Sequence, residues 1–185
     1  MIYEERIYGE KIYLRSVEMS DCNERYLSWL NDPDVNKYLE TRHSVQNMNT
    51  IRQYVSSEIN SSDSYLFAII NRETDEHVGN IRLSCINRFH LTAEVAILIG
   101  DKICWGKGFG TEAYILVVGF AFEKLGLYKC TLGVIASNVA GLKVVEKAGF
   151  LREGVLKEQT LNYLNQRDDA IRYGIINNSV QKTSE

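Results

Sequence analysis

Hydrophobic residues recur along the chain with two different spacings, and these divide it into extended and helical segments. Alternating or continuous apolar runs predict strands over residues 11–17, 65–70, 78–86, 93–99, 130–135, 150–156 and 170–176. Stripes of helical period predict helices over residues 21–30, 33–39, 44–59, 111–124 and 138–147. Side chains that accept hydrogen bonds at helix starts predict caps at Asp21 (or Ser20), Ser44 and Asn138.

The order of these elements, β-α-α-α-β-β-β-α-β-α-β-β, indicates the fold class. The strands are too clustered for a doubly wound parallel sheet, but the β-α-β-α-β stretch in the second half implies some parallel pairing. We therefore expect a mixed α/β sheet with helices on both faces. One domain accounts for the whole chain, residues 1–185, in which the polar residues 177–185 form a frayed tail.

Composition and charge narrow the class of protein. The 185 residues carry a net charge of -3, whereas nucleic-acid binders usually have a basic excess. The longest apolar run, residues 113–122, is too short to span a bilayer, so we expect a buried helix and no membrane partner. The four cysteines match no metal or redox spacing, which favours reduced, mostly buried thiols in a cytoplasmic protein without a metal. Monomer and homodimer both remain open.

A glycine-rich turn, Cys104-Trp105-Gly106-Lys107-Gly108-Phe109-Gly110-Thr111, joins a predicted strand to a predicted helix. Glycine permits positive φ and leaves backbone N–H groups bare, and a helix N-terminus adds partial positive charge. Together these features favour a pyrophosphate site. A Rossmann turn does not fit, because this turn follows several elements and Cys130 stands where an acidic residue is expected. A tight packing turn without a ligand is the plainer alternative.

A second segment, residues 136–150, reads ASNVAGLKVVEKAGF. Asn138 suits a helix N-cap and Gly149 suits the residue after the helix end, which is also what a simple capped surface helix would show. That simpler explanation does not account for the glycine-rich turn upstream.

Taken together, WGKGFGTEA and ASNVAGLKVVEKAGF resemble the GNAT acetyl-CoA N-acyltransferases, and the similarity extends over nearly the whole chain. The resemblance is to the branch with ribosomal-protein alanine acetyltransferases and amino-sugar acetyltransferases of polysaccharide pathways. It implies the GNAT fold, in which a strand here assigned to residues 94–99 splays from its parallel neighbour over 130–135 and holds the pantetheine of acetyl-CoA. The donor site it implies comprises Ile97, Leu98, Ile99, Trp105, Gly106, Lys107, Gly108, Phe109, Gly110, Thr111 and Asn138.

The resemblance also implies a general base at Glu94, which begins the splayed strand. An alkyl amine has a pKa of about 10 and must lose a proton before it attacks a thioester. A solvated carboxylate or an ion-pair partner is the alternative role for Glu94, and His90 is the alternative base. A backbone N–H near residues 96–98 is the expected oxyanion donor. The relatives' tyrosine and serine are replaced by Val145 and Gly141, so no general acid is assigned.

The acceptor is expected to be a primary amine of a small molecule, most plausibly a nucleotide-linked amino sugar. Residues 29–42 resemble the corresponding segment of sugar-amine acetyltransferases, which implies that Tyr38, Arg42 and His43 face the acceptor. The loop before Glu94, with His90, and the final hairpin are also expected to form the acceptor site. Helical packing in the core is the alternative for Tyr38. Two other functions stay open: acetylation of a protein N-terminal amine, and acetyl-CoA binding without catalysis.

Overall fold

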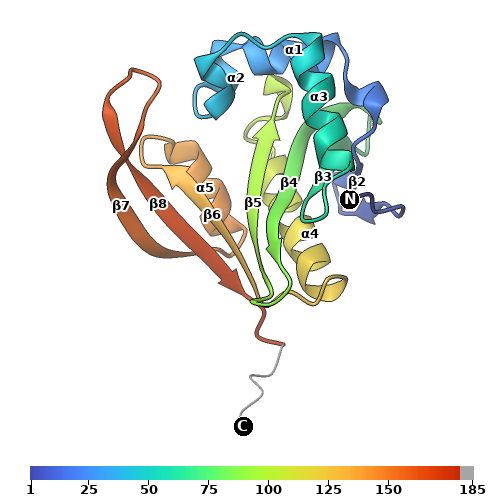
Figure 1. Cartoon of the computed structure of the whole chain (residues 1–185), viewed down its shortest axis with the longest axis vertical. Coiled ribbons are helices and arrows are strands. Elements are labelled where there is room, and N and C mark those ends of the chain that lie inside the picture. Colours follow the sequence, from blue (N-terminus) through green and yellow to red (C-terminus); the bar gives the residue numbers. More distant parts are fainter. Residues whose placement is uncertain (180–185) are drawn as a thin grey trace.

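A computed structural model describes residues 1–179 as one eight-stranded mixed sheet with the strand order β1-β2-β3-β4-β5-β6-β8-β7 (Figure 1). The strands are β1 (Ile7–Tyr8), β2 (Ile12–Ser16), β3 (Tyr65–Asn71), β4 (His77–Asn87), β5 (Thr92–Ile99), β6 (Lys129–Ile135), β7 (Leu151–Leu161) and β8 (Arg167–Ile176). The helices are α1 (Glu24–Asn31), α2 (Pro33–Asn36), α3 (Met48–Ile59), α4 (Phe109–Glu123) and α5 (Val139–Lys147), and three short 3-10 turns are η1 (Met19–Asp21), η2 (Glu40–His43) and η3 (Lys102–Cys104). This arrangement confirms the predicted mixed sheet.

Two cores hold the helices on opposite faces of the sheet. The larger core packs α4 and α5 against the middle strands, with Phe67, Ile81 and Val117 fully shielded from solvent. The smaller core packs α1 and α3 against the other face, where Trp29 and Val55 meet Leu66. Figure 1 shows α3 in front of the sheet and α4 behind it. The apolar run of residues 113–122 lies within α4, as predicted for a buried helix.

The parallel pair β5 and β6 is held together at one end only. Its register comprises Thr92 with Lys129, Ala93 with Cys130 and Glu94 with Thr131. Beyond Glu94, no residue of β5 pairs with a residue of β6, and Figure 1 shows the two strands diverging. Since both strands continue after this point, a V-shaped gap opens in the middle of the sheet, as the resemblance implied.

Two helix starts differ from the predicted positions. The cap of α3 is Asn47 rather than Ser44, because the Asn47 side chain accepts from the amides of Asn49 and Thr50. The cap of α1 is Asn23, while Asp21 instead ends a separate 3-10 turn and pairs with Arg15.

Several other predictions concern the chain as a whole. Cys22, Cys104 and Cys130 are buried and Cys85 is exposed, so most of the cysteines are buried as predicted. Within residues 1–179, no helix has the length and apolarity needed to cross a membrane. Of the predicted tail 177–185, residues 180–185 lie outside the described residues.

Candidate active site

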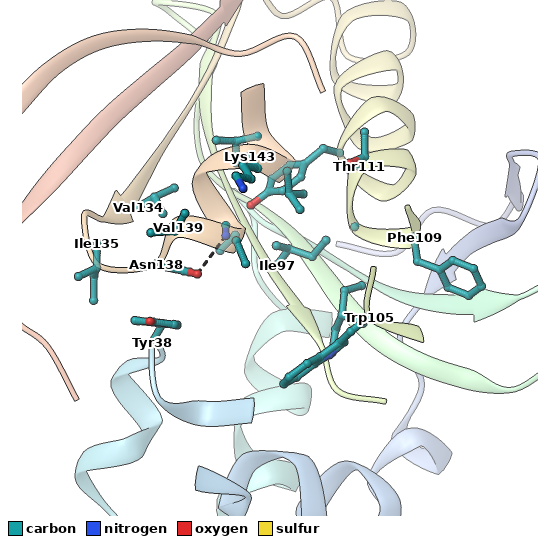
Figure 2. Close-up of a pocket in the computed structure, with 18 of the residues that line it drawn as sticks. Tyr38, Ile97, Trp105, Phe109, Thr111, Val134, Ile135, Asn138, Val139 and Lys143 are labelled. Carbon is teal, nitrogen blue, oxygen red and sulfur yellow. Dashed lines mark hydrogen bonds between the residues drawn. The ribbon is translucent and has the colours of Figure 1, made fainter. Parts of the chain in front are cut away.

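A cavity of about 670 Å³ lies where β5 and β6 separate (Figure 2). Its wall includes Val95 and Ile97, which point to the α4 face of the sheet, and Ala96, which points to the opposite face with its neighbour Leu98. Gly133 of β6 completes the lining between them. Because residues of both faces line one space, the cavity passes through the sheet. Two molecules can therefore approach a common point from opposite sides.

The glycine-rich turn forms one end of this cavity. Gly106 and Gly108 have φ of 75° and 89°, a region that side-chain-bearing residues rarely adopt. Gly108 is the N-cap residue of α4, so the amides of the first turn of that helix, at Phe109, Gly110 and Thr111, point out of the helix start. Within residues 1–179 these three amides have no recorded protein acceptor. The helix start therefore presents unpaired N–H groups to the cavity.

The surroundings of the turn fit a bound pyrophosphate. A Cβ on Gly106 would meet no atom within 4 Å, so the space above the turn is open. The Lys11 ammonium donates to the Lys107 carbonyl at 3.0 Å, which places a cation at the rim of the turn. Lys143 of α5 brings a second cation to the cavity wall (Figure 2). Open space, free amides and two cations match the size and charge of a diphosphate.

The predicted donor residues divide into those that line the cavity and two that do not. The residues on the cavity wall are Ile97, Ile99, Trp105, Gly106, Gly108, Phe109, Gly110, Thr111 and Asn138. Leu98 points to the other face of the sheet and packs in the smaller core, because side chains alternate along a strand. Lys107 is absent from the lining, and it is its carbonyl that holds Lys11. Neither side chain lines this cavity, and donor binding by the strand backbone at Leu98 and by the turn at Lys107 stays a prediction.

Asn138 and Trp105 are fixed in place by their own hydrogen bonds. The Asn138 side-chain oxygen accepts from the amide of Gly141 at 3.0 Å, so Asn138 caps α5 while lining the cavity (Figure 2). The Trp105 indole donates to the Ile99 carbonyl at 2.9 Å and thereby covers the end of β5. Both side chains form preorganised walls.

Glu94 lies at the point where β5 and β6 part, although it is not part of the cavity lining. Its Oε1 accepts from Nη2 of Arg172 at 2.8 Å, and both side chains are partly exposed, by 49% and 35%. Arg172 belongs to β8 and reaches Glu94 by crossing β6 over Gly133, with which it is in register. The ion-pair role is thus realised in this structure, and the role as a base stays a prediction.

Of the four predicted acceptor residues, only Tyr38 lines the cavity. Its hydroxyl donates to the Ser137 carbonyl at 3.0 Å. Arg42 is buried against the carbonyls of Leu39 and Leu161, so its guanidinium holds the tip of the β7–β8 hairpin. His43 is exposed beside Glu40. His90 is exposed in the β4–β5 turn, at the end of β5 opposite to the glycine-rich turn. Arg42, His43 and His90 are therefore not brought to the cavity.

Three further residues at the site were not predicted from the sequence. Ser137 lines the cavity, and its buried hydroxyl has no hydrogen-bond partner within residues 1–179. Lys37 lies 5.3 Å from the ring of Tyr38 and 5.9 Å from that of Tyr163, at the rim. Lys37 and Ser137 are next in sequence to the predicted site residues Tyr38 and Asn138. Tyr163 lies in a hairpin turn, and no motif in the sequence indicates it.

Comparisons with known proteins identify the family. The model described as "Acetyltransferase (GNAT) domain" matches residues 11–151. This chain belongs to the GNAT acetyltransferase family. It is similar to the probable N-acetyltransferase YjcK of Bacillus subtilis, with 30% identity over 81% of this chain and 86% of that protein. The uncharacterized N-acetyltransferase p20 of Bacillus licheniformis is 28% identical over 83% of this chain and 86% of that protein.

The fold matches a solved structure of spermidine N-acetyltransferase from Vibrio cholerae in complex with CoA and spermine. The TM-score is 0.80 at 23% identity, over 91% of this chain and 96% of that one. The GNAT chain described here is an acetyl-CoA-dependent N-acetyltransferase. The ribosomal-protein and amino-sugar branch expected from the sequence is finer than these comparisons resolve and stays a prediction.

Proposed function

We propose that this GNAT enzyme acetylates a primary amine that enters from the α3 face of the sheet, while the donor lies on the α4 face. The observation that carries the proposal is the cavity through the sheet, with free amides of the glycine-rich turn at one end and Glu94 at the split. The chain's own groups suit a diphosphate at residues 106–111. When bound, acetyl-CoA supplies a thioester carbonyl carbon for the amine to attack.

Glu94 is the proposed proton acceptor. An ammonium that approaches from the α3 face meets Oε2 of Glu94, since Oε1 is taken by Arg172. The proton passes from nitrogen to this carboxylate, and the freed lone pair forms the new C–N bond as the C–S bond breaks. The nitrogen loses its second proton to water as the amide forms. The sulfur leaves with the electrons of the C–S bond and takes up a proton from water. Amides on the open edge of β5 near residues 96–98 are the proposed donors to the oxyanion.

The experiment that tests this function compares Glu94→Gln with Glu153→Gln. Glu153 forms an ion pair with Lys129 on the same sheet, so its variant controls for the loss of a salt bridge. We expect Glu94→Gln to lower kcat/KM at neutral pH by about 10²–10⁴-fold, as is typical for a general base, with unchanged calorimetric affinity for CoA. Wild-type turnover in Glu94→Gln would remove Glu94 from the mechanism.

A nucleotide-linked amino sugar is the acceptor we propose among small amines. Lys37, Tyr38 and Tyr163 support it, because they combine a cation with two aromatic rings in edge contact, with centroids 6.0 Å apart, at the cavity rim. The cation suits a phosphate group of such an acceptor, and the aromatic rings suit its nucleobase. A thiol-release assay with a nucleotide-linked amino sugar, a peptide with a free N-terminal amine, and spermidine separates the candidates. Thiol release with none of a broad amine panel would contradict the catalytic function.

A further inference from the structure

The ion pair of Glu94 and Arg172 has an unusual position for a salt bridge. It lies in the middle of the sheet, where β5 and β6 part, and it spans three strands because Arg172 of β8 reaches over β6 to β5. Gly133 makes this crossing possible, since a Cβ at that position would come within 3.3 Å of Nη1 of Arg172. The pair therefore lies beside the cavity that passes through the sheet.

Each partner uses only one of its two outer atoms in this pair. Nη2 of Arg172 donates to Oε1 of Glu94 at 2.8 Å. Within residues 1–179, Nη1 of Arg172 has no recorded acceptor and Oε2 of Glu94 has no recorded donor. Both side chains are also partly exposed, by 35% and 49%. The pair thus offers a hydrogen-bond donor with positive charge next to an acceptor with negative charge.

A second guanidinium lies on the other flank of Glu94. Arg82 of β4 is directly opposite Ala96, two residues along β5 from Glu94, so it is on the same face of the sheet as Glu94. It pairs with Glu58 of α3 at 3.0 Å. A molecule that brings only positive charge to Glu94 would therefore approach between two guanidinium groups. Since Glu58 balances the charge of Arg82, the charge around Glu94 is about neutral, and an acceptor with both charges matches it better than a polycation does.

From this geometry we infer that Arg172 selects the acceptor: the enzyme prefers primary amines that carry an anionic group close to the amine. The ammonium binds Oε2 of Glu94, and the carboxylate or phosphate binds Nη1 of Arg172. Each charge of such an acceptor then gains a charge-assisted hydrogen bond, and the existing ion pair stays intact. The inference rests on the proposed function, because it takes Glu94 as the group that meets the amine.

The test measures kcat/KM for matched amines that differ in one anionic group. β-Alanine is compared with propylamine, and glucosamine 6-phosphate with glucosamine, with spermidine as a polycation. We expect the anionic member of each pair to be preferred by on the order of 10–100-fold, the range of one hydrogen bond to a charged group. Arg172→Gln is expected to abolish this preference, so that β-alanine and propylamine have about equal kcat/KM when both are measured with this variant.

Arg152→Gln is the matched control variant. Arg152 lies on the same hairpin in register with Tyr173, a core residue, and so it sits on the opposite face from Arg172. The control is expected to keep the preference of the wild type. A purely structural role for Arg172 would lower kcat/KM for both members of a pair equally, which would overturn the inference.

Two other outcomes separate the inference from the proposed function. If the wild type acetylates propylamine and β-alanine equally, or prefers spermidine, the inference fails and the acetyl transfer stands. If no amine is acetylated, the proposed function fails and the inference fails with it.

Discussion

The donor side of the cavity, formed by residues 105–111 and 137–143, is built differently from the acceptor side. The acceptor side is formed by residues 34–39, and Glu94 and the β7–β8 hairpin lie beside it. On the donor side the binding groups are backbone amides and glycines within two short segments, each fixed by a helix start. On the acceptor side they are side chains from segments far apart in the chain, such as Tyr38 and Tyr163. A common donor needs only a generic cradle, whereas the acceptor side has to be specific. Substitutions on either side therefore have different expected effects.

The largest effect is expected from Gly108→Val on the donor side. At a φ of 89°, a β-branched residue is strained by at least about 1–2 kcal/mol. Its Cβ would lie 3.7 Å from Nζ of Lys11, the cation at the rim of the turn, so we expect the turn to be displaced. We expect the affinity for CoA, measured by calorimetry, to fall by at least about 100-fold, since several amide contacts to an anion are lost together.

Gly119→Ala is the control for that substitution. Gly119 lies in α4 with ordinary φ, and a Cβ there would meet no atom within 4 Å. This variant is expected to bind CoA like the wild type. If Gly108→Val also binds CoA like the wild type while remaining folded, the glycine-rich turn is not the diphosphate site.

A smaller effect is expected from removing one helix cap on each side. Asn138 caps α5 at the cavity and Asn47 caps α3 away from it. Either change to Ala costs about 1 kcal/mol, so each lowers Tm by about 2–4 °C for a domain of this size. Only Asn138→Ala is expected to weaken CoA binding as well. Equal CoA affinity in both variants would show that Asn138 acts on stability alone.

The sequence predicted the donor side better than the acceptor side for a physical reason. Local signals, such as glycines at a strand–helix junction and an Asn before a helix, report on backbone geometry within a few residues. Nine of the donor residues that were predicted from such signals line the cavity. Leu98 was predicted as part of a strand whose backbone binds the donor, and its side chain packs in the smaller core because side chains alternate along β5.

The acceptor side depends on long-range contacts that no local pattern encodes. Arg42 was predicted to bind substrate, yet its guanidinium donates a hydrogen bond to the carbonyl of Leu161, which lies in a distant hairpin. Arg172 meets Glu94 only because β8 inserts between β6 and β7 and because Gly133 leaves room. The order of the strands had to be known before either contact could be predicted.

Tyr38→Phe is expected to have a still smaller effect, confined to the acceptor side. It removes the hydrogen bond to the Ser137 carbonyl, worth about 0.5–1.5 kcal/mol, which ties the segment after α2 to the loop before α5. We expect KM for the acceptor to rise about 2–10-fold, with CoA affinity unchanged. Tyr163→Phe keeps the aromatic contact and serves as the control. An equal rise in KM in both variants would show that the hydrogen bond to the Ser137 carbonyl is not the specific cause.

The smallest expected effect concerns the pH dependence of the N-terminal helices. His77 packs against the rings of Tyr26 and Trp29 of α1, with centroids 6.1 and 5.1 Å away. Burial lowers the pKa of His77 below its ordinary value of 6.5, and the nearby Asp21 only partly opposes this. The unfolded chain therefore binds this proton more readily than the folded one. The free energy of unfolding is unaffected above about pH 6.5 and decreases as the pH falls from there toward the folded pKa.

Asp21 does not obscure this dependence. Its pKa is lowered from 3.8 by Arg15 and the Glu18 amide against the effect of burial, so its contribution is lost only at more acidic pH. We expect the urea midpoint of unfolding to be lower at about pH 5 than at about pH 7.5. His77→Gln is expected to make this difference smaller. His90→Gln, at an exposed position, is expected to leave it unchanged. An identical pH dependence in His77→Gln and the wild type would mean that His77, which packs beneath α1, is not the source of this pH dependence.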